Sequence, residues 1–192
     1  MCVSIRLNLE LNLELKLRLE QWLKQDPIRM QAIEFAVKLD LPQWLLAAGF
    51  VRNLVWDRLH GGLNSAINDI DLIYFDADDL SESRERAYQK QLESWAPHLP
   101  WSVKNQARMH IRNCDAAYTS CEHAMSFWPE CETAIGIHVS RDNSQFDLFA
   151  PFGLESLFDL KLTHNPKREL SLFNARKDQK AWLTRYPKLQ LA

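Results

Sequence analysis

The chain has 192 residues, of which 46% are hydrophobic, and its formal net charge is −2 at pH 7. This length fits one domain with a full core. The weak negative charge gives no general attraction to long nucleic acid or to an anionic membrane surface. No apolar run reaches the roughly 20 residues that a membrane-spanning helix needs. Four cysteines without a Cys-x-x-Cys pair favour a reducing compartment, and we expect a cytoplasmic protein.

The first residues are leucine-rich, with leucine at every odd position from Leu7 to Leu19. Such alternation is typical of a strand with one apolar face, but the Glu, Lys and Arg residues between the leucines favour a helix. We expect residues 1–14 to be poorly structured or frayed, and a regular helix from Leu15 to Lys24 that ends before Pro27. A strand is the alternative. Residues 15–192 are expected to form one domain.

The rest of the chain alternates between segments with helical periodicity and segments with strand periodicity. Helices are predicted over residues 27–39, 50–62, 81–97, 153–165 and 169–187. Strands are predicted over 42–49, 69–75, 132–140 and 144–151, and residues 101–111 as a strand that runs into a turn. Because strands and helices interleave, the predicted class is α+β or α/β.

The stretch "NDIDLIYFD" places two carboxylates at the start of a predicted buried strand. Residues two apart in a strand point to the same face, so Asp69 and Asp71 would lie roughly 6–7 Å apart. Two like charges that close cost free energy unless a cation lies between them. A hard, oxygen-seeking ion such as Mg²⁺ would answer that need. Asp147, in a later apolar strand, could complete the metal site or take a proton; the alternative is an outward-facing residue of an edge strand.

A second candidate feature is the junction at Gly49, where a predicted strand ends and a helix begins at once. The free N–H groups of a helix N-terminus favour a phosphate. Arg52, one turn into the helix, adds a positive charge that can bind phosphate oxygens. The alternative is an ordinary strand-to-helix turn, with Arg52 paired to a surface acid.

Two further groups of polar residues are weaker candidates. The run "VKNQARMH" could contact an acceptor or a phosphate, or could form a polar turn, through Lys104, Asn105, Gln106, Arg108 and His110. The spacing of Cys114, Cys121, Cys131 and His123 matches no familiar zinc site, so we expect structural thiols.

"AGFVRNLVWDRLHG" followed by "NDIDLIYFD" resembles the signature of the polymerase-beta-type nucleotidyltransferase superfamily, whose tRNA CCA-adding branch carries Gly-Gly-x-Val-Arg-Asp, a helix and then Asp-x-Asp. Residues from about 17 to 187 are similar to a bacterial family of stand-alone nucleotidyltransferase-like proteins. That likeness also rests on "VKNQARMH" and "APFGLESLFDL".

The resemblance implies a small mixed β-sheet flanked by helices, with helices at both ends of the chain. It implies metal-dependent transfer of a nucleoside monophosphate from a nucleoside triphosphate to an unknown acceptor, with Mg²⁺ or Mn²⁺. By position, Gly49 and Arg52 belong to the phosphate-binding turn, Asp69 and Asp71 are the metal pair, and Asp147 is the expected third carboxylate.

Two nucleotide-binding positions depart from the family pattern. Phe50 stands where we expect the second small residue of the turn, and Asn53 stands where the pattern has Asp. Both departures favour an alternative function, a non-catalytic protein that senses a nucleotide or binds a partner on the same scaffold. A third alternative is metal-dependent phosphoester hydrolysis. The acceptor, the base of the nucleotide and the oligomeric state stay open.

Overall fold

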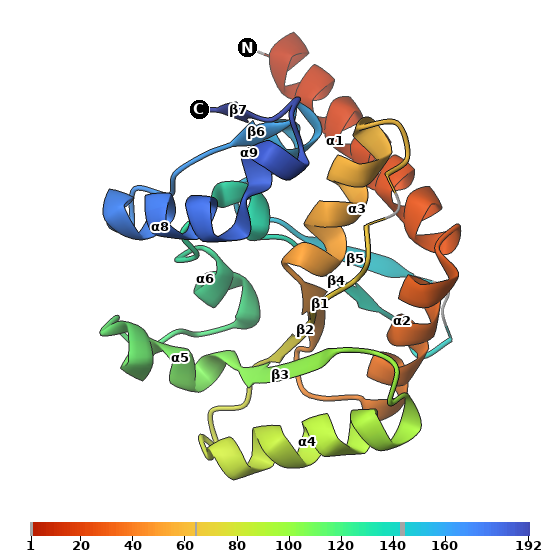
Figure 1. The fold of residues 1–192 in the computed structure, drawn as a ribbon, viewed down its shortest axis with the longest axis vertical. Helices are drawn as coiled ribbons and strands as arrows, with labels where there is room; N and C mark the ends of the chain where they lie inside the picture. Colours follow the sequence, from red (N-terminus) through yellow and green to blue (C-terminus); the bar gives the residue numbers. More distant parts are fainter. Residues whose placement is uncertain (1, 64, 143–144) are drawn as a thin grey trace.

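A mixed five-stranded sheet forms the centre of the molecule (Figure 1), with the strand order β3-β2-β1-β4-β5. The computed structural model describes residues 2–63, 65–142 and 145–192, with side chains from residue 10 onward. The strands are β1 Leu45–Ala47, β2 Ile70–Tyr74, β3 Trp101–Asn105, β4 Gly136–Val139 and β5 Phe146–Phe149. A separate parallel pair joins β6 Lys161–Leu162 to β7 Gln190–Leu191. The predicted α+β class, a small mixed sheet flanked by helices, is confirmed.

The pairing of β1 decides where the ends of the strands meet. This strand runs antiparallel to both β2 and β4, whereas β2 and β3 are parallel. The last residue of β1, Ala47, is therefore paired with Asp71 near the start of β2, and Asp71 is in turn paired with Ser102 of β3. The turn that follows β1 consequently lies beside Asp71.

Helices cover both faces of the sheet unequally. One face, with Leu46, Leu72 and Ile137, packs into the main core together with side chains of α1 Cys2–Lys24, α2 Pro27–Leu39, α3 Gly49–Leu59 and α4 Glu82–Trp95. The other face, with Leu45 and Ile73, meets a smaller cluster that includes α6 Cys121–Met125. Asp71 shares this thinner face with Ile73, because residues two apart in a strand point the same way.

The remaining helices are α5 Gln106–Asn113, α7 Glu155–Phe158, α8 Leu170–Lys180 and α9 Trp182–Arg185, with a 3₁₀ turn at Cys131–Thr133. The α8–α9 segment lies across the molecule from α4 (Figure 1). None of the described helices combines the length and apolarity that crossing a membrane requires.

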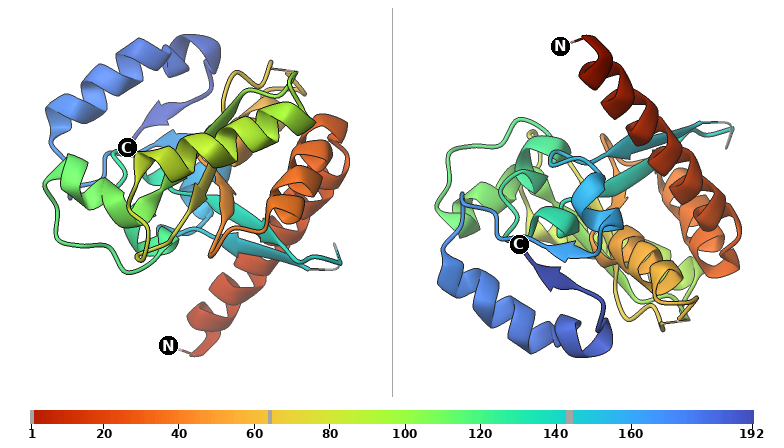
Figure 2. Two further views of the ribbon diagram at one scale, coloured as in Figure 1. Left: turned by 90° about the horizontal axis from the view of Figure 1, so that it is seen from below. Right: turned by 90° about the horizontal axis from the view of Figure 1, so that it is seen from above.

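The N-terminal segment is helical, and α1 extends beyond the rest of the domain at its N-terminal end (Figure 2). The helix predicted over residues 15–24 is confirmed and the strand alternative is wrong, because burial follows a spacing of four residues. Leu15, Leu19 and Leu23 are buried, whereas Leu17 is exposed. Met1 and the side chains of residues 2–9 lie outside the described part, and the boundary at residue 14 stays a prediction.

Three elements differ from the sequence predictions. The turn expected after β3 is the helix α5, because the side chain of Asn105 caps it by accepting from the amide of Ala107. The helix expected over 153–165 is only the short α7, since Leu160 takes a positive φ of 56° and the chain then pairs as β6. The helix expected over 169–187 is broken at Ala181, whose φ is 49°.

Replacing single leucines of α1 tests its burial pattern. We expect Leu19→Ala to lower the free energy of unfolding by about 2–4 kcal/mol, because a fully buried leucine leaves a cavity. Leu17→Ala, the matched control, should change it by less than about 0.5 kcal/mol, since its side chain is exposed. Urea denaturation measures both values, and equal losses would contradict the helical assignment.

Candidate functional site

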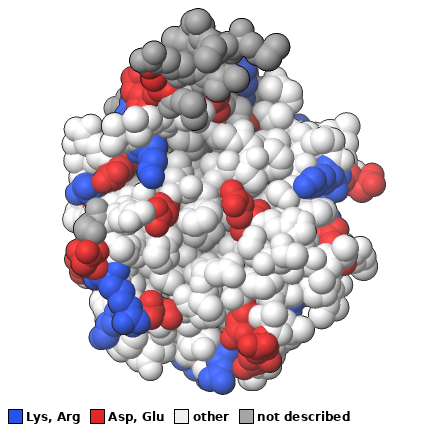
Figure 3. Space-filling model, turned by 180° about the vertical axis from the view of Figure 1, so that it is seen from behind, with Lys and Arg blue, Asp and Glu red and all other residues white. Residues whose placement is uncertain are grey.

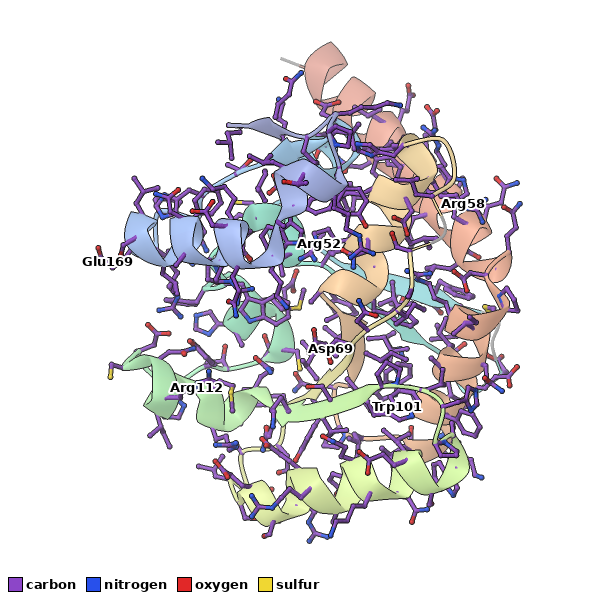
Figure 4. All side chains as sticks on the ribbon, in the orientation of Figure 1. Arg52, Arg58, Asp69, Trp101, Arg112 and Glu169 are labelled. Carbon is purple, nitrogen blue, oxygen red and sulfur yellow. The ribbon has the colours of Figure 1, made fainter. Side chains whose placement is uncertain are left out.

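A cavity of about 280 Å³ lies where α3 and β2 begin and where α8 meets α9. Figure 4 shows Arg52 and Asp69 near the centre of the molecule, whereas Arg112 and Glu169 lie at its periphery. The walls come from the turn after β1, the loop before β2 and the C-terminal helices. The chemically informative lining residues are Gly49, Arg52, Asn53, Asp69, Asp71, Thr133, Arg176, Lys180 and Arg185.

The turn at the head of α3 has an unusual backbone. Ala48 has φ 55° and ψ −125°, the conformation of the first central residue of a type II′ turn, which glycine favours. Its amide donates to the carbonyl of Ile135, and its carbonyl accepts from the amides of Val51 and Arg52. These bonds hold the turn at the wall of the cavity, which includes Ala48 and Gly49, and the first N–H groups of α3 have no partner within the helix.

Gly49 keeps this turn accessible. A Cβ atom at this position would lie 3.3 Å from Asn53 Nδ2 and 3.6 Å from Arg52 Nη2. Because glycine has no Cβ atom, the side-chain amide of Asn53 and the guanidinium of Arg52 can lie close to the backbone of the turn. The junction can therefore present side-chain donors and backbone donors to one anion.

Phe50 does not have the place that the sequence suggested. Its side chain is fully buried in the main core, and it is absent from the cavity wall. Matching Val51 and Arg52 to the Val-Arg of the family pattern puts Gly49 at the second glycine and Ala48 at the first. Phe50 is thus a core residue that leaves the turn free, and the departure from the glycine pair of the pattern is Ala48, beside the departure at Asn53.

Arg52 is a fixed charge below the turn. Its Nη1 donates to Thr133 Oγ1 and its Nη2 to Asn53 Oδ1. Its guanidinium carbon lies 4.9 Å from the ring centroid of Trp56 and 4.5 Å from that of Trp182. Burial lowers the pKa of Arg52 to about 10, so it stays charged at neutral pH. In the described part of the chain it has no ion pair with a surface acid, which contradicts the alternative that Arg52 serves only to pair with such an acid.

Asp69 and Asp71 converge on the same cavity. Asp69 precedes β2 and is exposed, while Asp71 lies within the strand and is half-buried. Burial, and then the neighbouring charge of Asp69, raise the pKa of Asp71 to about 6, although Arg52, Lys180 and a hydrogen bond from Ser102 oppose the rise. Burial likewise raises the pKa of Asp69.

These two carboxylates fit a divalent cation. Neither forms an ion pair within 4 Å in the described part of the chain, so their repulsion is only partly offset. Carboxylate oxygens are the ligands that Mg²⁺ prefers, and this ion commonly takes one or two carboxylates plus substrate phosphates. Among the described residues, no group of three or more His, Cys, Asp or Glu side chains could hold a metal.

Asp147 is not brought to the pair. It lies on β5, at the edge of the sheet and three strands away from β2. At a strand spacing of about 4.8 Å, this puts it roughly 14 Å from Asp71 across the sheet. Its carboxylate accepts from Gln145 Nε2 and lies 3.8 Å from His138 Nδ1. Asp147 therefore has no part in the site, contrary to its predicted role as the third carboxylate and metal ligand.

The "VKNQARMH" run is also away from the cavity, whose wall includes none of Lys104, Asn105, Gln106, Arg108 and His110. Arg108 forks onto the buried Glu85, and Lys104 pairs with the same carboxylate. Asn105 caps α5 and donates to the carbonyls of Asp76 and Asp79. These contacts are structural, as in the polar-turn alternative. Cys114, Cys121 and Cys131 are free thiols.

The structure adds residues that sequence reasoning missed. Arg176 and Lys180, four residues apart on one face of α8, line the cavity together with Arg185 of α9. The signal was present as the basic run "ARKDQK", but nothing local relates this run to aspartates more than a hundred residues earlier. Only the fold brings the two together.

Comparisons with known proteins agree with this geometry. Residues 34–191 match the family described as nucleotidyltransferase. The chain belongs to this nucleotidyltransferase family. A solved NMR structure described as a CCA-adding enzyme head domain is similar to it, with a TM-score of 0.80 and 30% identity over 91% of this chain and 94% of that chain. No curated protein matches the sequence. The predicted nucleotidyltransferase resemblance and fold are confirmed.

The raised pKa of Asp71 predicts how this nucleotidyltransferase-family protein responds to pH. The folded protein holds the proton up to about pH 6, whereas the unfolded chain releases it near 3.8. Stability without metal should therefore fall as pH rises from about 4 to 6. Asp71→Asn should remove this dependence and raise the free energy of unfolding at pH 7.5 by about 2 kcal/mol in EDTA. Urea denaturation at several pH values checks this, and a less stable variant at pH 7.5 would contradict it.

The strained turn gives a second prediction. Ala48→Gly should raise the free energy of unfolding by about 1 kcal/mol, because glycine adopts a positive φ without the steric cost that Ala48 bears. Ala47→Gly is the matched control: it lies within β1 and is fully buried, so it should lower stability by about 1 kcal/mol. Thermal denaturation of both variants measures the difference, and a destabilised Ala48→Gly would show that the turn is not strained.

Proposed function

We propose that this protein is a metal-dependent nucleotidyltransferase that moves a nucleoside monophosphate from a nucleoside triphosphate to an acceptor. The observation that carries the proposal is the meeting, in one cavity, of the Ala48–Gly49 turn, the buried Arg52 and the Asp69–Asp71 pair. Phosphoryl chemistry of this type needs positioned positive charge and metal ligands rather than a strong nucleophilic side chain. This cavity supplies both.

Asp69 and Asp71 are the residues that would hold Mg²⁺ or Mn²⁺. Bound there, such a metal would supply positive charge to offset the negative charge that develops on the transferred phosphoryl group. Asp71 is anchored in β2 between β1 and β3, so its position is set by strand pairing on both sides. Asp69, exposed at the entrance, can adjust to the metal and the nucleotide.

The protein's own groups bind and orient the triphosphate. The first amides of α3 and the side chain of Asn53 donate to its phosphate oxygens, and Arg52 supports them from below with a fixed charge. An acceptor hydroxyl then attacks the α-phosphorus, the bond to the leaving oxygen breaks and pyrophosphate departs. The hydroxyl proton leaves to water, because the cavity wall carries no carboxylate besides Asp69 and Asp71 among the described residues.

The acceptor is best sought among small molecules and protein hydroxyls. On the face shown in Figure 3, the described Lys and Arg side chains are interspersed with Asp and Glu rather than joined in a band. The net charge of −2 likewise gives no long-range attraction to a polyanion. We also propose a cytoplasmic location, on the cysteine pattern.

A second candidate is a protein of the same fold that binds a nucleotide without turning it over. The observation that favours it is the missing third carboxylate, since Asp147 lies on the far edge of the sheet. A protein that keeps Asp69, Asp71 and the Ala48–Gly49 turn but lacks a proton acceptor would still bind the nucleotide. Turnover separates the two candidates.

The test is transfer of label from each of the four ribonucleoside triphosphates, with Mg²⁺ or Mn²⁺ and a cell extract as the source of acceptors. We expect Asp69→Asn and Asp71→Asn each to lower transfer by about 100-fold or more, because each removes a metal ligand. Asp147→Asn is the matched control and should keep transfer within about twofold, since that carboxylate lies outside the cavity.

Unchanged transfer by both pair variants would refute the proposal. Binding of a triphosphate by the wild type without transfer to any acceptor would support the second candidate instead. Release of free monophosphate with no labelled acceptor would indicate the phosphoester hydrolase that the sequence left as a third alternative.

A further inference from the structure

Among the described residues, five basic side chains line the cavity, and their contacts differ. Arg29 donates to the carbonyl of Phe50 and pairs with Asp26. Arg52 packs against two indole rings that also contact each other. The guanidinium of Arg176 forks onto the buried Glu130, and that of Arg185 lies 5.3 Å from the ring centroid of Tyr186. The fifth, Lys180, has no hydrogen bond and no ion pair within 4 Å in the described part of the chain.

The local backbone explains how Lys180 reaches the site. It is the last residue of α8, and Ala181 then adopts a left-handed conformation with φ 49° and ψ 37°. The helix ends there, and α9 starts with Trp182, whose buried ring packs against the guanidinium of Arg52. Lys180 is consequently anchored at its backbone next to the cavity while its side chain is exposed at the rim.

Lys180 shares the cavity wall with Asp69 and Asp71, so its positive charge lies at the same cavity as the two carboxylates. Arg52 lines this wall too but is held by its hydrogen bonds and ring contacts. Arg185 contacts the ring of Tyr186, whereas Lys180 has no hydrogen bond, ion pair or ring contact in the described part of the chain. Lys180 is therefore the basic residue of this wall whose side chain is least restrained.

We propose that Lys180 is a substrate-binding residue that exchanges partners, balancing Asp69 and Asp71 in the free protein and binding the phosphate chain of a nucleoside triphosphate once a divalent metal is present. This inference rests on the proposed function. The exchange follows from charge: the ammonium group would be repelled by a divalent cation held by Asp69 and Asp71 and attracted by the anionic phosphate oxygens that bind with that cation. A flexible lysine suits both partners better than a fixed arginine fork.

The partner exchange predicts two effects of opposite sign. Removing the ammonium group takes away a competitor of the metal, so metal alone should bind more tightly. It also takes away a phosphate ligand, so a metal–triphosphate complex should bind more weakly. A residue that only balanced the aspartates would give the first effect without the second, and a residue that only supported the fold would weaken both.

Isothermal titration of the full chain tests this, with Mn²⁺ alone, with Mg²⁺–tripolyphosphate and with each Mg²⁺–nucleoside triphosphate. We expect Lys180→Met to bind Mn²⁺ about threefold more tightly and Mg²⁺–tripolyphosphate about tenfold more weakly than wild type. Lys180→Arg, which keeps the charge, should recover most of the tripolyphosphate affinity. Lys177→Met is the matched control on the same helix, because Lys177 pairs with Asp178 and contacts Asn174 outside the cavity wall.

The results separate this inference from the proposed function. If wild type binds a nucleoside triphosphate with Mg²⁺ and Lys180→Met binds it equally well, the role of Lys180 is refuted while the function stands. Equal losses in Lys180→Met and Lys177→Met would also refute it, since any lysine of α8 would then have the same effect. If wild type binds no nucleoside triphosphate with Mg²⁺, the proposed function itself fails.

Discussion

The antiparallel pairing of β1 with β2 is the constraint on which the site depends. It joins Ala47 to Asp71, so the strand that ends in the Ala48–Gly49 turn ends beside the strand that begins with the aspartates. The same short strand pairs with β4 on its other side, where Ile135 accepts from the amide of Ala48. A three-residue strand thereby fixes the position of the turn and the aspartate pair relative to each other. Any shift of register by one residue would move Asp71 to the opposite, fully packed face.

Aromatic packing links this central arrangement to the end of the chain. Arg52 packs against both Trp56 of α3 and Trp182 of α9, so the charge beneath the turn is positioned partly by a residue 130 positions later. Tyr186 reinforces the link, because its hydroxyl donates to the buried Asp57, which also accepts from Ser65 in the loop before β2. The C-terminal helices are thus part of the site, and their packing brings Arg176 and Lys180 to its rim.

How far the sequence could predict this site depends on the range of the interactions. Asp69, Asp71 and Gly49 were predictable because a strand pattern and a strand-to-helix junction are local signals, and their spacing matches a family signature. Asp147 was misplaced because its pattern fixed a strand but not the strand's place in the sheet, which only tertiary pairing decides. The "VKNQARMH" residues were uncertain for a related reason: their partner, the buried Glu85, lies about twenty residues away on α4.

The fold elements divide in the same way. Helices with a clear apolar face, such as α2 and α3, were predicted closely, whereas the segment after residue 153 followed helical periodicity and yet forms a short helix and a strand. There, a left-handed Leu160 and the pairing of β6 with β7 override the local preference. Phe50 shows the converse error, since a residue next to Gly49 of the turn was taken as part of the site although its side chain belongs to the core.

Two features of the site lower the stability of the protein, and both have the same explanation. Ala48 keeps a backbone conformation that glycine favours, and Asp71 keeps a carboxylate whose burial and neighbour oppose its charge. Strand pairing around them holds Ala48 in its unfavourable backbone conformation and Asp71 in its unfavourable environment. Unfavourable free energies of this kind are concentrated at sites where proteins bind or react. Phosphate on the turn and a cation between the aspartates would offset them. Under the proposed function, binding of metal and triphosphate would therefore relieve both costs, and affinity for these ligands would be coupled to the stability of the central sheet.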